Sequence, residues 1–167
     1  MSSMSEEQSV KVYNILDQLN IDYIKYEHPP AHTMEIIKEL NIDTEEIHCK
    51  NLFLRNSSGK IHYLLMVEGS KQPNLKQLAK QIGSTRLSFA SKERMEKHLG
   101  LKPGAVSPLG LINDEERKVQ VLIDKDLIEI EKITFHPNVN TASVTMDYKD
   151  FEKFLEWRGN KLSIVEI

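Results

Sequence analysis

The sequence lacks several features that identify common classes of protein. It contains one cysteine among 167 residues, so no disulfide can form within the chain. It has no run of about 18 apolar residues, and such a run is what a membrane-spanning helix requires. The first residues are polar and acidic, without the apolar stretch of a signal peptide. These absences predict a cytoplasmic protein with no membrane partner.

Motifs of several enzyme classes are also missing. The sequence has no Gly-x-x-x-x-Gly-Lys phosphate loop, no Gly-x-Gly-x-x-Gly dinucleotide fingerprint and no Gly-x-Ser-x-Gly hydrolase elbow. His28 and His32 are four residues apart, but Pro29 and Pro30 preclude the helix that would align them on a metal ion. We therefore predict no metal site and no cofactor.

What is present is the composition of a globular protein with an uneven charge. The chain is 40% hydrophobic and 28% charged, and we predict one domain over residues 1–167. The net charge is −3, yet residues 1–50 hold 4 Lys and Arg against 10 Asp and Glu, and residues 71–102 hold 8 against 2. Such segregation favours binding of a polyanion, although a pair of solvated helix faces would also explain it.

Apolar periodicity predicts alternating helices and strands. Helices are expected to start at five polar residues: Ser5, Thr33, Asn74, Ser91 and Asp147. Strands are expected over residues 23–26, 50–55, 61–67, 119–123, 133–135, 142–146 and 163–167. Residues 50–55 and 61–67 are continuously apolar and joined by a probable turn, so we expect a hairpin covered on both faces. The pattern predicts an α/β (α+β) fold, a mixed sheet wrapped by helices.

Residues 102–110 form the most informative loop. They read Lys-Pro-Gly-Ala-Val-Ser-Pro-Leu-Gly, with two glycines, two prolines and one charge. Proline fixes φ and has no N–H, whereas glycine lets the backbone approach a bound group closely. The loop is therefore expected to present its own peptide groups to a ligand.

Four residues outside this loop are candidates for a catalytic role, three before it in the sequence and one after it. His48, Cys49 and Lys50 place a base, a thiol and a cation side by side. On a strand, however, Cys49 points away from His48 and Lys50, and a lone cysteine is more often a small buried hydrophobe than a nucleophile. Lys50 opens an apolar strand, where it is either functional or an edge lysine in water. His136 precedes a turn and is either at a pocket rim or structural.

Five segments together resemble a known family. They are residues 28–33 (His-Pro-Pro-Ala-His-Thr), 50–55 (Lys-Asn-Leu-Phe-Leu-Arg), 86–90 (Arg-Leu-Ser-Phe-Ala), 103–114 with Gly104 to Pro108 as Gly-x-x-x-Pro, and 135–141 (Phe-His-Pro-Asn-Val-Asn-Thr). In this order they resemble the YbaK/prolyl-tRNA-synthetase-associated editing domain superfamily, and within it the free-standing prolyl-tRNA editing proteins of the ProXp-ala (PrdX) type.

The resemblance implies a fold, a reaction and a set of site residues. The fold would be a mostly antiparallel, barrel-like sheet surrounded by helices. The reaction would be hydrolysis of a mischarged tRNA, with alanine on the tRNA for proline as the expected substrate and prolyl-tRNA synthetase as a partner. Lys50, Gly104 and His136 would be catalytic. Substrate-binding residues would be His28, Thr33, Asn51, Ala105, Val106, Ser107, Pro108 and Asn140. The basic segment adds candidate tRNA contacts at Lys71, Lys76, Lys80, Arg86, Lys97 and Lys102.

Two alternatives stay open at the level of sequence. Within the superfamily, the substrate could be cysteinyl-, seryl- or threonyl-tRNA, because pocket volume decides between them. Outside enzymology, the chain could be a binding module that keeps the pocket without turnover.

Overall fold

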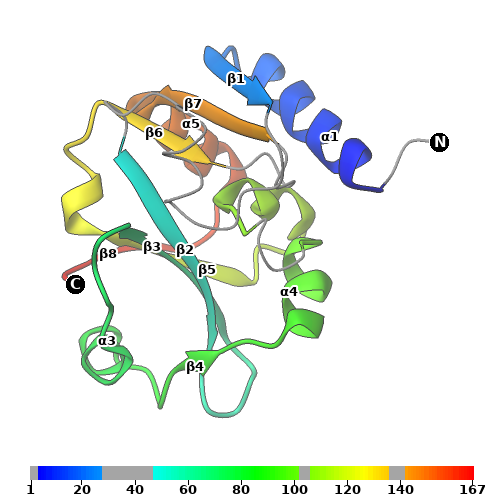
Figure 1. Cartoon of the computed structure of the whole chain (residues 1–167). Coiled ribbons are helices and arrows are strands. Elements are labelled where there is room, and N and C mark those ends of the chain that lie inside the picture. Colours follow the sequence, from blue (N-terminus) through cyan, green and yellow to red (C-terminus); the bar gives the residue numbers. More distant parts are fainter. Residues whose placement is uncertain (1–3, 28–46, 102–105, 136–141) are drawn as a thin grey trace.

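The computed structural model describes residues 4–27, 47–101, 106–135 and 142–167 (Figure 1). The elements follow in chain order as α1 (Met4–Gln18), β1 (Tyr23–Glu27), β2 (Ile47–Arg55), β3 (His62–Glu68), α3 (Leu75–Ile82), β4 (Ser88–Phe89), α4 (Lys92–Leu99), the 3₁₀ helix η1 (Pro108–Asn113), β5 (Val119–Asp124), the 3₁₀ helix η2 (Lys125–Leu127), β6 (Lys132–Phe135), β7 (Ala142–Asp147), α5 (Tyr148–Arg158) and β8 (Leu162–Val165).

The strands form one mixed sheet with the order β1-β7-β6-β2-β3-β5-β8, and β4 pairs with β2 beside this path. Four of the pairings are antiparallel, namely β1 with β7, β6 with β7, β2 with β3 and β2 with β4. Three are parallel, namely β2 with β6, β3 with β5 and β5 with β8. The predicted mixed α/β sheet is confirmed, and no pairing of the described strands closes the path from β1 to β8 into a barrel.

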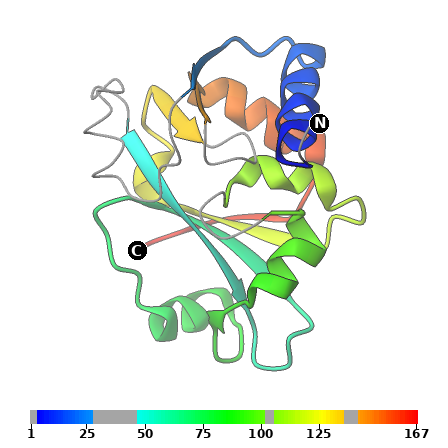
Figure 2. The ribbon, with the colours of Figure 1, turned by 45° about the vertical axis from the view of Figure 1, so that its right-hand side comes forward.

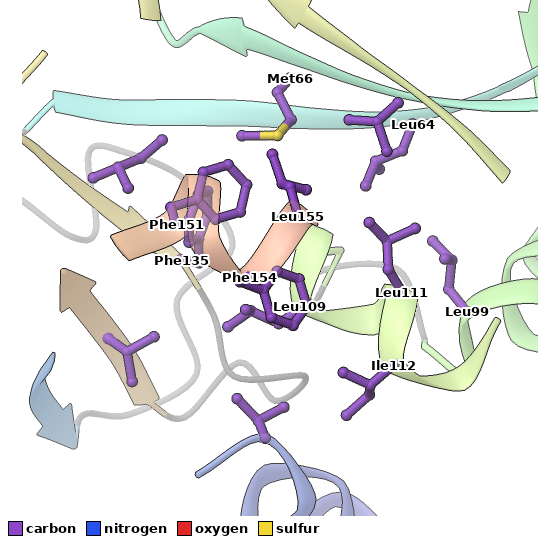
Figure 3. Packing of buried hydrophobic residues seen from close by; sticks show 14 of the residues in the cluster. Leu64, Met66, Leu99, Leu109, Leu111, Ile112, Phe135, Phe151, Phe154 and Leu155 are labelled. Carbon is purple, nitrogen blue, oxygen red and sulfur yellow. The ribbon is translucent and has the colours of Figure 1, made fainter. Parts of the chain in front are cut away.

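The central strand β3 is buried on both faces, as its apolar run predicts. Leu64 and Met66 point into a large cluster with α1, α4, η1 and α5, whereas Leu65 and Val67 point into a smaller cluster with α3. Figure 3 shows Leu64 and Met66 on the same side of the strand, facing side chains from α5 and η1. The turned view in Figure 2 shows α3 and α5 on opposite sides of these strands. The sheet therefore separates two cores.

Local sequence signals set most helix ends. Asn74 accepts hydrogen bonds from the N–H groups of Lys76 and Gln77, and Ser91 accepts one from Arg94. Gly83 ends α3 with φ +70°, a left-handed conformation that favours glycine. These helix starts and ends match the prediction.

Other expectations were wrong in detail. α1 begins at Met4, so Ser5 lies inside the first turn rather than before it. Asp147 occupies the N-cap position of α5, but its side chain makes no capping hydrogen bond. The short strand β4 and both 3₁₀ helices were not predicted, because segments of this length carry no measurable period. The helix expected from Thr33 lies outside the described residues.

Candidate functional site

The start of β2 directs neighbouring side chains to opposite faces of the sheet. Cys49 and Phe53 contribute to the large cluster, while Leu52 and Leu54 contribute to the smaller one. By this alternation Lys50 belongs to the face of the smaller cluster, and the expected separation of Cys49 from Lys50 is confirmed. A thiol–ammonium pair between these neighbours is therefore excluded.

The ammonium of Lys50 is held by the loop that follows β3. Its Nζ donates a hydrogen bond to the carbonyl oxygen of Lys71 at 2.7 Å, in a partly buried position. An ammonium has three N–H donors, and this is its one hydrogen bond among the described residues. Lys50 is therefore fixed in direction, and no described residue accepts a hydrogen bond from its other two donors.

The residue that provides this carbonyl is itself anchored. The Nζ of Lys71 lies 3.0 Å from both carboxylate oxygens of Asp124 and 2.6 Å from Oδ2 of Asp126, and it donates to the carbonyl of Ile167 at 3.4 Å. The hydrogen bond to Asp126 raises the pKa of Lys71, so this cation stays charged. The two ion pairs hold the loop in place beneath Lys50.

Asp124 is the centre of this anchor. It is fully buried at the end of β5, and it accepts hydrogen bonds from the backbone N–H groups of Glu68 and Asp126 at 3.1 and 3.0 Å. A buried carboxylate is stable only when such donors and a cation compensate the loss of water. We name the set Lys71, Asp124 and Asp126 the loop anchor.

Asn51 connects the other face of β2 to the glycine- and proline-containing loop. Its Nδ2 donates to the carbonyl oxygen of Val106 at 3.5 Å, and the thiol of Cys49 lies 3.9 Å from its Oδ1. Ser107 and Pro108 are buried at the start of η1, and the Ser107 hydroxyl accepts the N–H of Leu109 at 3.1 Å. The loop before η1 therefore contacts β2 on the face opposite to the one that carries Lys50.

The single cysteine does not have the character of a nucleophile. Burial raises the pKa of Cys49 to about 12, and the side chain packs against the large cluster. A thiol with this pKa is protonated at neutral pH, whereas the thiolate is the reactive form.

The candidate tRNA contacts have different environments. Lys76, Lys80, Arg86 and Lys97 are exposed, the first two on α3 and the last on α4. The ammonium of Lys71 instead forms ion pairs with the carboxylates of Asp124 and Asp126. The geometry favours an internal role for Lys71 over contact with a phosphate.

The remaining predicted site residues lie outside the described residues. They are the catalytic candidates Gly104 and His136, the binding candidates His28, Thr33, Ala105 and Asn140, and the basic residue Lys102. Their roles stay predictions from the sequence.

Two of the anchor residues, Asp124 and Asp126, were not predicted from the sequence, and Lys71 was predicted with a different role. An aspartate directly after the buried strand 119–123 is a recognisable signal, since a charge at a strand end is costly to bury. Its partner Lys71 is 53 positions away in the sequence, and only the fold brings the two together.

The described residues show neither a metal-binding cluster nor a membrane-spanning helix. They hold no group of three or more His, Cys, Asp or Glu side chains arranged to bind a metal ion. None of the helices described is both long and apolar enough to cross a membrane.

Comparison with known proteins identifies relatives over most of the chain. The family model of the aminoacyl-tRNA editing domain matches residues 28–154. The prolyl-tRNA editing protein ProX of Acetoanaerobium sticklandii is 42% identical over 152 residues, which cover 91% of this chain and 93% of that protein. The prolyl-tRNA synthetase associated domain-containing protein 1 of Xenopus laevis is 33% identical over 154 residues, covering 90% and 91%.

A solved structure agrees in fold. The crystal structure of a candidate trans-editing enzyme for prolyl tRNA synthetase superposes with a TM-score of 0.70 at 18% identity, covering 96% of this chain and 97% of that one. At this identity the likeness concerns the fold alone.

Proposed function

Because the chain belongs to the aminoacyl-tRNA editing domain family, we propose that it is a trans-editing hydrolase that removes a wrong amino acid from tRNA. The observation that carries this proposal is the 42% identity to a prolyl-tRNA editing protein over more than nine-tenths of both chains. The substrate is then the acceptor end of a charged tRNA. The amino acid removed is alanine, and the tRNA is the one for proline.

The need for such an enzyme follows from the energetics of small side chains. A synthetase pocket built for proline rejects a smaller amino acid only by the binding it loses, about 0.8 kcal/mol for each missing methylene. This gives too little discrimination for translation, so a second site must accept the small product and exclude the large one. A free-standing domain provides that second site, and direct association with prolyl-tRNA synthetase would deliver its substrate.

The reaction is an ester hydrolysis. A water molecule attacks the carbonyl carbon of the aminoacyl ester, charge develops on the carbonyl oxygen, and the bond to the terminal ribose oxygen breaks with transfer of the water's proton to that oxygen. The products are a free amino acid and an uncharged tRNA. The ester is already reactive, so positioning of water and stabilisation of the oxyanion are sufficient, without a covalent nucleophile.

We assign roles to the chain's own residues on this basis. Lys50, held by the carbonyl of Lys71, directs the N–H donors that no described residue engages at the oxyanion or at the terminal phosphate. It does so from the face of β2 opposite to the one that contacts Val106. Gly104 and the following peptide groups bind the amino acid and the ester carbonyl. Asn51 positions this loop through Val106, and Ser107 and Pro108 fix its exit into η1. The ribose hydroxyl of the substrate orients the water.

The first experiment tests the reaction and its substrate together. The protein is incubated with the tRNAs charged with alanine (on the tRNA for proline), cysteine, serine and threonine, and release of the radiolabelled amino acid is followed in single turnover. Fast release of alanine alone supports the proposal. Faster release of another amino acid reassigns the substrate within the family. Tight binding without release of any of the four would show a binding module.

Lys50→Ala provides the sharpest variant. Loss of the Lys50 ammonium at the scissile bond should lower the single-turnover rate at least about 100-fold, the usual effect of removing one oxyanion donor. Lys149→Ala, an exposed lysine on α5, is the matched control and should keep the wild-type rate. Near-normal turnover by a folded Lys50→Ala protein would remove Lys50 from the mechanism. Rate against pH for Lys50 and His136 variants then identifies which group transfers a proton.

A further inference from the structure

A second hollow lies at the far end of β2 from Lys50. It has a volume of about 490 Å³ and opens between the β2–β3 turn and α4. Its lining includes four cations, Lys60, Arg94, Lys97 and Lys118, and one carboxylate, Glu93, among the described residues. Lys118 is paired with Glu116 at 2.7 Å, whereas Lys60, Arg94 and Lys97 have no ion pair among the described residues and are the cations that define this cavity. Lys97 also lines a neighbouring hollow that contains Asp114, Glu115 and Glu116. We name it the basic cavity.

Arg94 is held in one orientation within the basic cavity. Its Nη1 donates to the carbonyl oxygen of Gly59 at 2.9 Å and lies 3.1 Å from Nε2 of His62. A Cβ at position 59 would lie 2.8 Å from Nη2, and Gly59 also has φ +72°, so glycine is what lets the guanidinium lie against the turn. Only Nη1 is engaged by the described residues, and the other donors form a planar fork of the kind that matches a phosphate.

Two histidines form the inner wall. His62 is 4% exposed, its ring stacks on Phe53 with a centroid distance of 5.4 Å, and the ring of His98 is 4.1 Å away. Burial, followed by His98 and neighbouring cations, lowers the pKa of His62 to about 4, and burial and Lys97 also lower that of His98. Both rings are therefore neutral at pH 7 and add no charge to the cavity, so its charge comes from the lysines and Arg94.

We propose that the basic cavity binds a backbone phosphate of the tRNA, with Arg94 as the oriented fork and Lys60 and Lys97 as flanking charges. This inference rests on the proposed function, which makes tRNA the substrate.

The distance between the basic cavity and Lys50 can be estimated along β2. Arg55, at the end of β2, pairs with His62 in the sheet, and Lys50 precedes Arg55 by five residues. At about 3.4 Å per residue this separates the two by about 17 Å along the strand, and the cavity lies on the Phe53 face of the sheet, opposite to that of Lys50. A stacked strand rises about 3.4 Å per nucleotide, so the phosphate is at least about five nucleotides from the charged end.

The test uses the double variant Lys60→Gln/Lys97→Gln, because neither side chain has a hydrogen-bond partner among the described residues and the contacts of Arg94 stay intact. Two substrates are compared, full-length alanyl-tRNA and alanyl-adenosine, an ester that carries no phosphate. We expect the ratio of kcat/KM for the tRNA to that for the ester to fall at least about 10-fold. The slope of log KM against log salt should fall by about 1 to 2. Lys149→Gln is the control and should leave both quantities at the wild-type value.

The outcomes separate this inference from the proposed function. An unchanged ratio and an unchanged salt slope in an active double variant would overturn the basic cavity as a tRNA site while leaving the hydrolase intact. If the wild type releases no amino acid from any charged tRNA, the proposed function falls. Fluorescence anisotropy of an uncharged acceptor hairpin then still tests the cavity, with weaker binding by the double variant as the supporting result. If inorganic phosphate shifts the ring signals of His98 but the hairpin does not bind, the site serves a free anion and the proposal is wrong.

Discussion

At the scale of single residues, the neighbours Lys50 and Asn51 on β2 contact two different loops. Lys50 is bonded to the loop after β3, and Asn51 is bonded to the loop before η1. Because consecutive side chains on a strand point to opposite faces, a two-residue unit can connect two loops that lie more than 30 positions apart in the sequence. A shift of the β2 register by one residue would turn Lys50 toward the face that Asn51 now occupies. The ammonium of Lys50 would then be buried where the side-chain amide of Asn51 now lies.

His62 provides a prediction at the same scale. Its pKa of about 4 in the folded chain is below the ordinary value of about 6.5, so between these pH values the unfolded chain binds a proton that the folded chain does not. The free energy of unfolding should therefore fall as the pH falls through this window, by at most about 3 kcal/mol from this group. His62→Gln removes the titration.

The measurement is urea unfolding of both proteins at pH 7.5 and pH 4. The wild type should lose more stability than His62→Gln over this interval, because every other titrating group is common to the two. Equal losses would show that the pKa of His62 is not lowered by the fold.

At the scale of elements, the loop between β3 and α3 depends on a distant strand. The loop anchor joins Lys71 to Asp124 at the end of β5 and to Asp126 in η2, while the backbone carbonyl of Lys71 orients Lys50. The side chain of Lys71 thus acts on the site through the position of its own peptide group. We regard Lys71 as a positioning residue.

Lys71→Met tests this role. Loss of the cation leaves the carboxylate of Asp124 buried without its ion pair, which should lower the free energy of unfolding by about 1 to 3 kcal/mol. Because Lys50 loses its fixed direction, kcat should fall about 10-fold with a much smaller change in KM. Lys71→Arg should restore part of kcat, and Lys149→Met on α5 should change neither quantity. A loss of stability with wild-type kcat would reduce the anchor to a purely structural role.

At the scale of the whole molecule, one sheet supports two cores of unequal size. Leu65 belongs to the smaller core with α3, and Leu64 to the larger one with α4, η1 and α5. Both are fully buried, whereas Leu162 on the edge strand β8 is 46% exposed. The cores share β3 and therefore should unfold together.

Leucine-to-alanine substitutions at these three positions test that view. Leu64→Ala and Leu65→Ala should each lower the free energy of unfolding by about 2 to 5 kcal/mol, the cost of a cavity in a packed core. Leu162→Ala, the matched control, should cost less than about 1 kcal/mol. Thermal unfolding followed by circular dichroism gives all three values, and a single transition is expected for each variant. Two separate transitions, or a small effect of Leu65→Ala, would show that the α3 side is independent of the main core.

The sequence by itself determined the order of the helices and strands, and it predicted several residues of the candidate site. Apolar runs placed β2, β3 and β5, and capping residues such as Asn74 and Ser91 placed helix starts, because these signals act over a few neighbouring residues. Lys50 and Asn51 were also predicted as site residues from the sequence, and the structure places each in contact with one of the two loops, while their roles stay predictions.

Only the tertiary structure decided which distant groups meet. Lys71 was expected to contact tRNA, yet it is held by Asp124 and Asp126 more than 50 positions later, and the basic cavity joins a turn at Gly59 to side chains of α4. The physical reason is that electrostatic and hydrogen-bond partners are chosen by distance in space. The pairing of β3 with β5 and of β2 with β4, which no local period encodes, sets those distances.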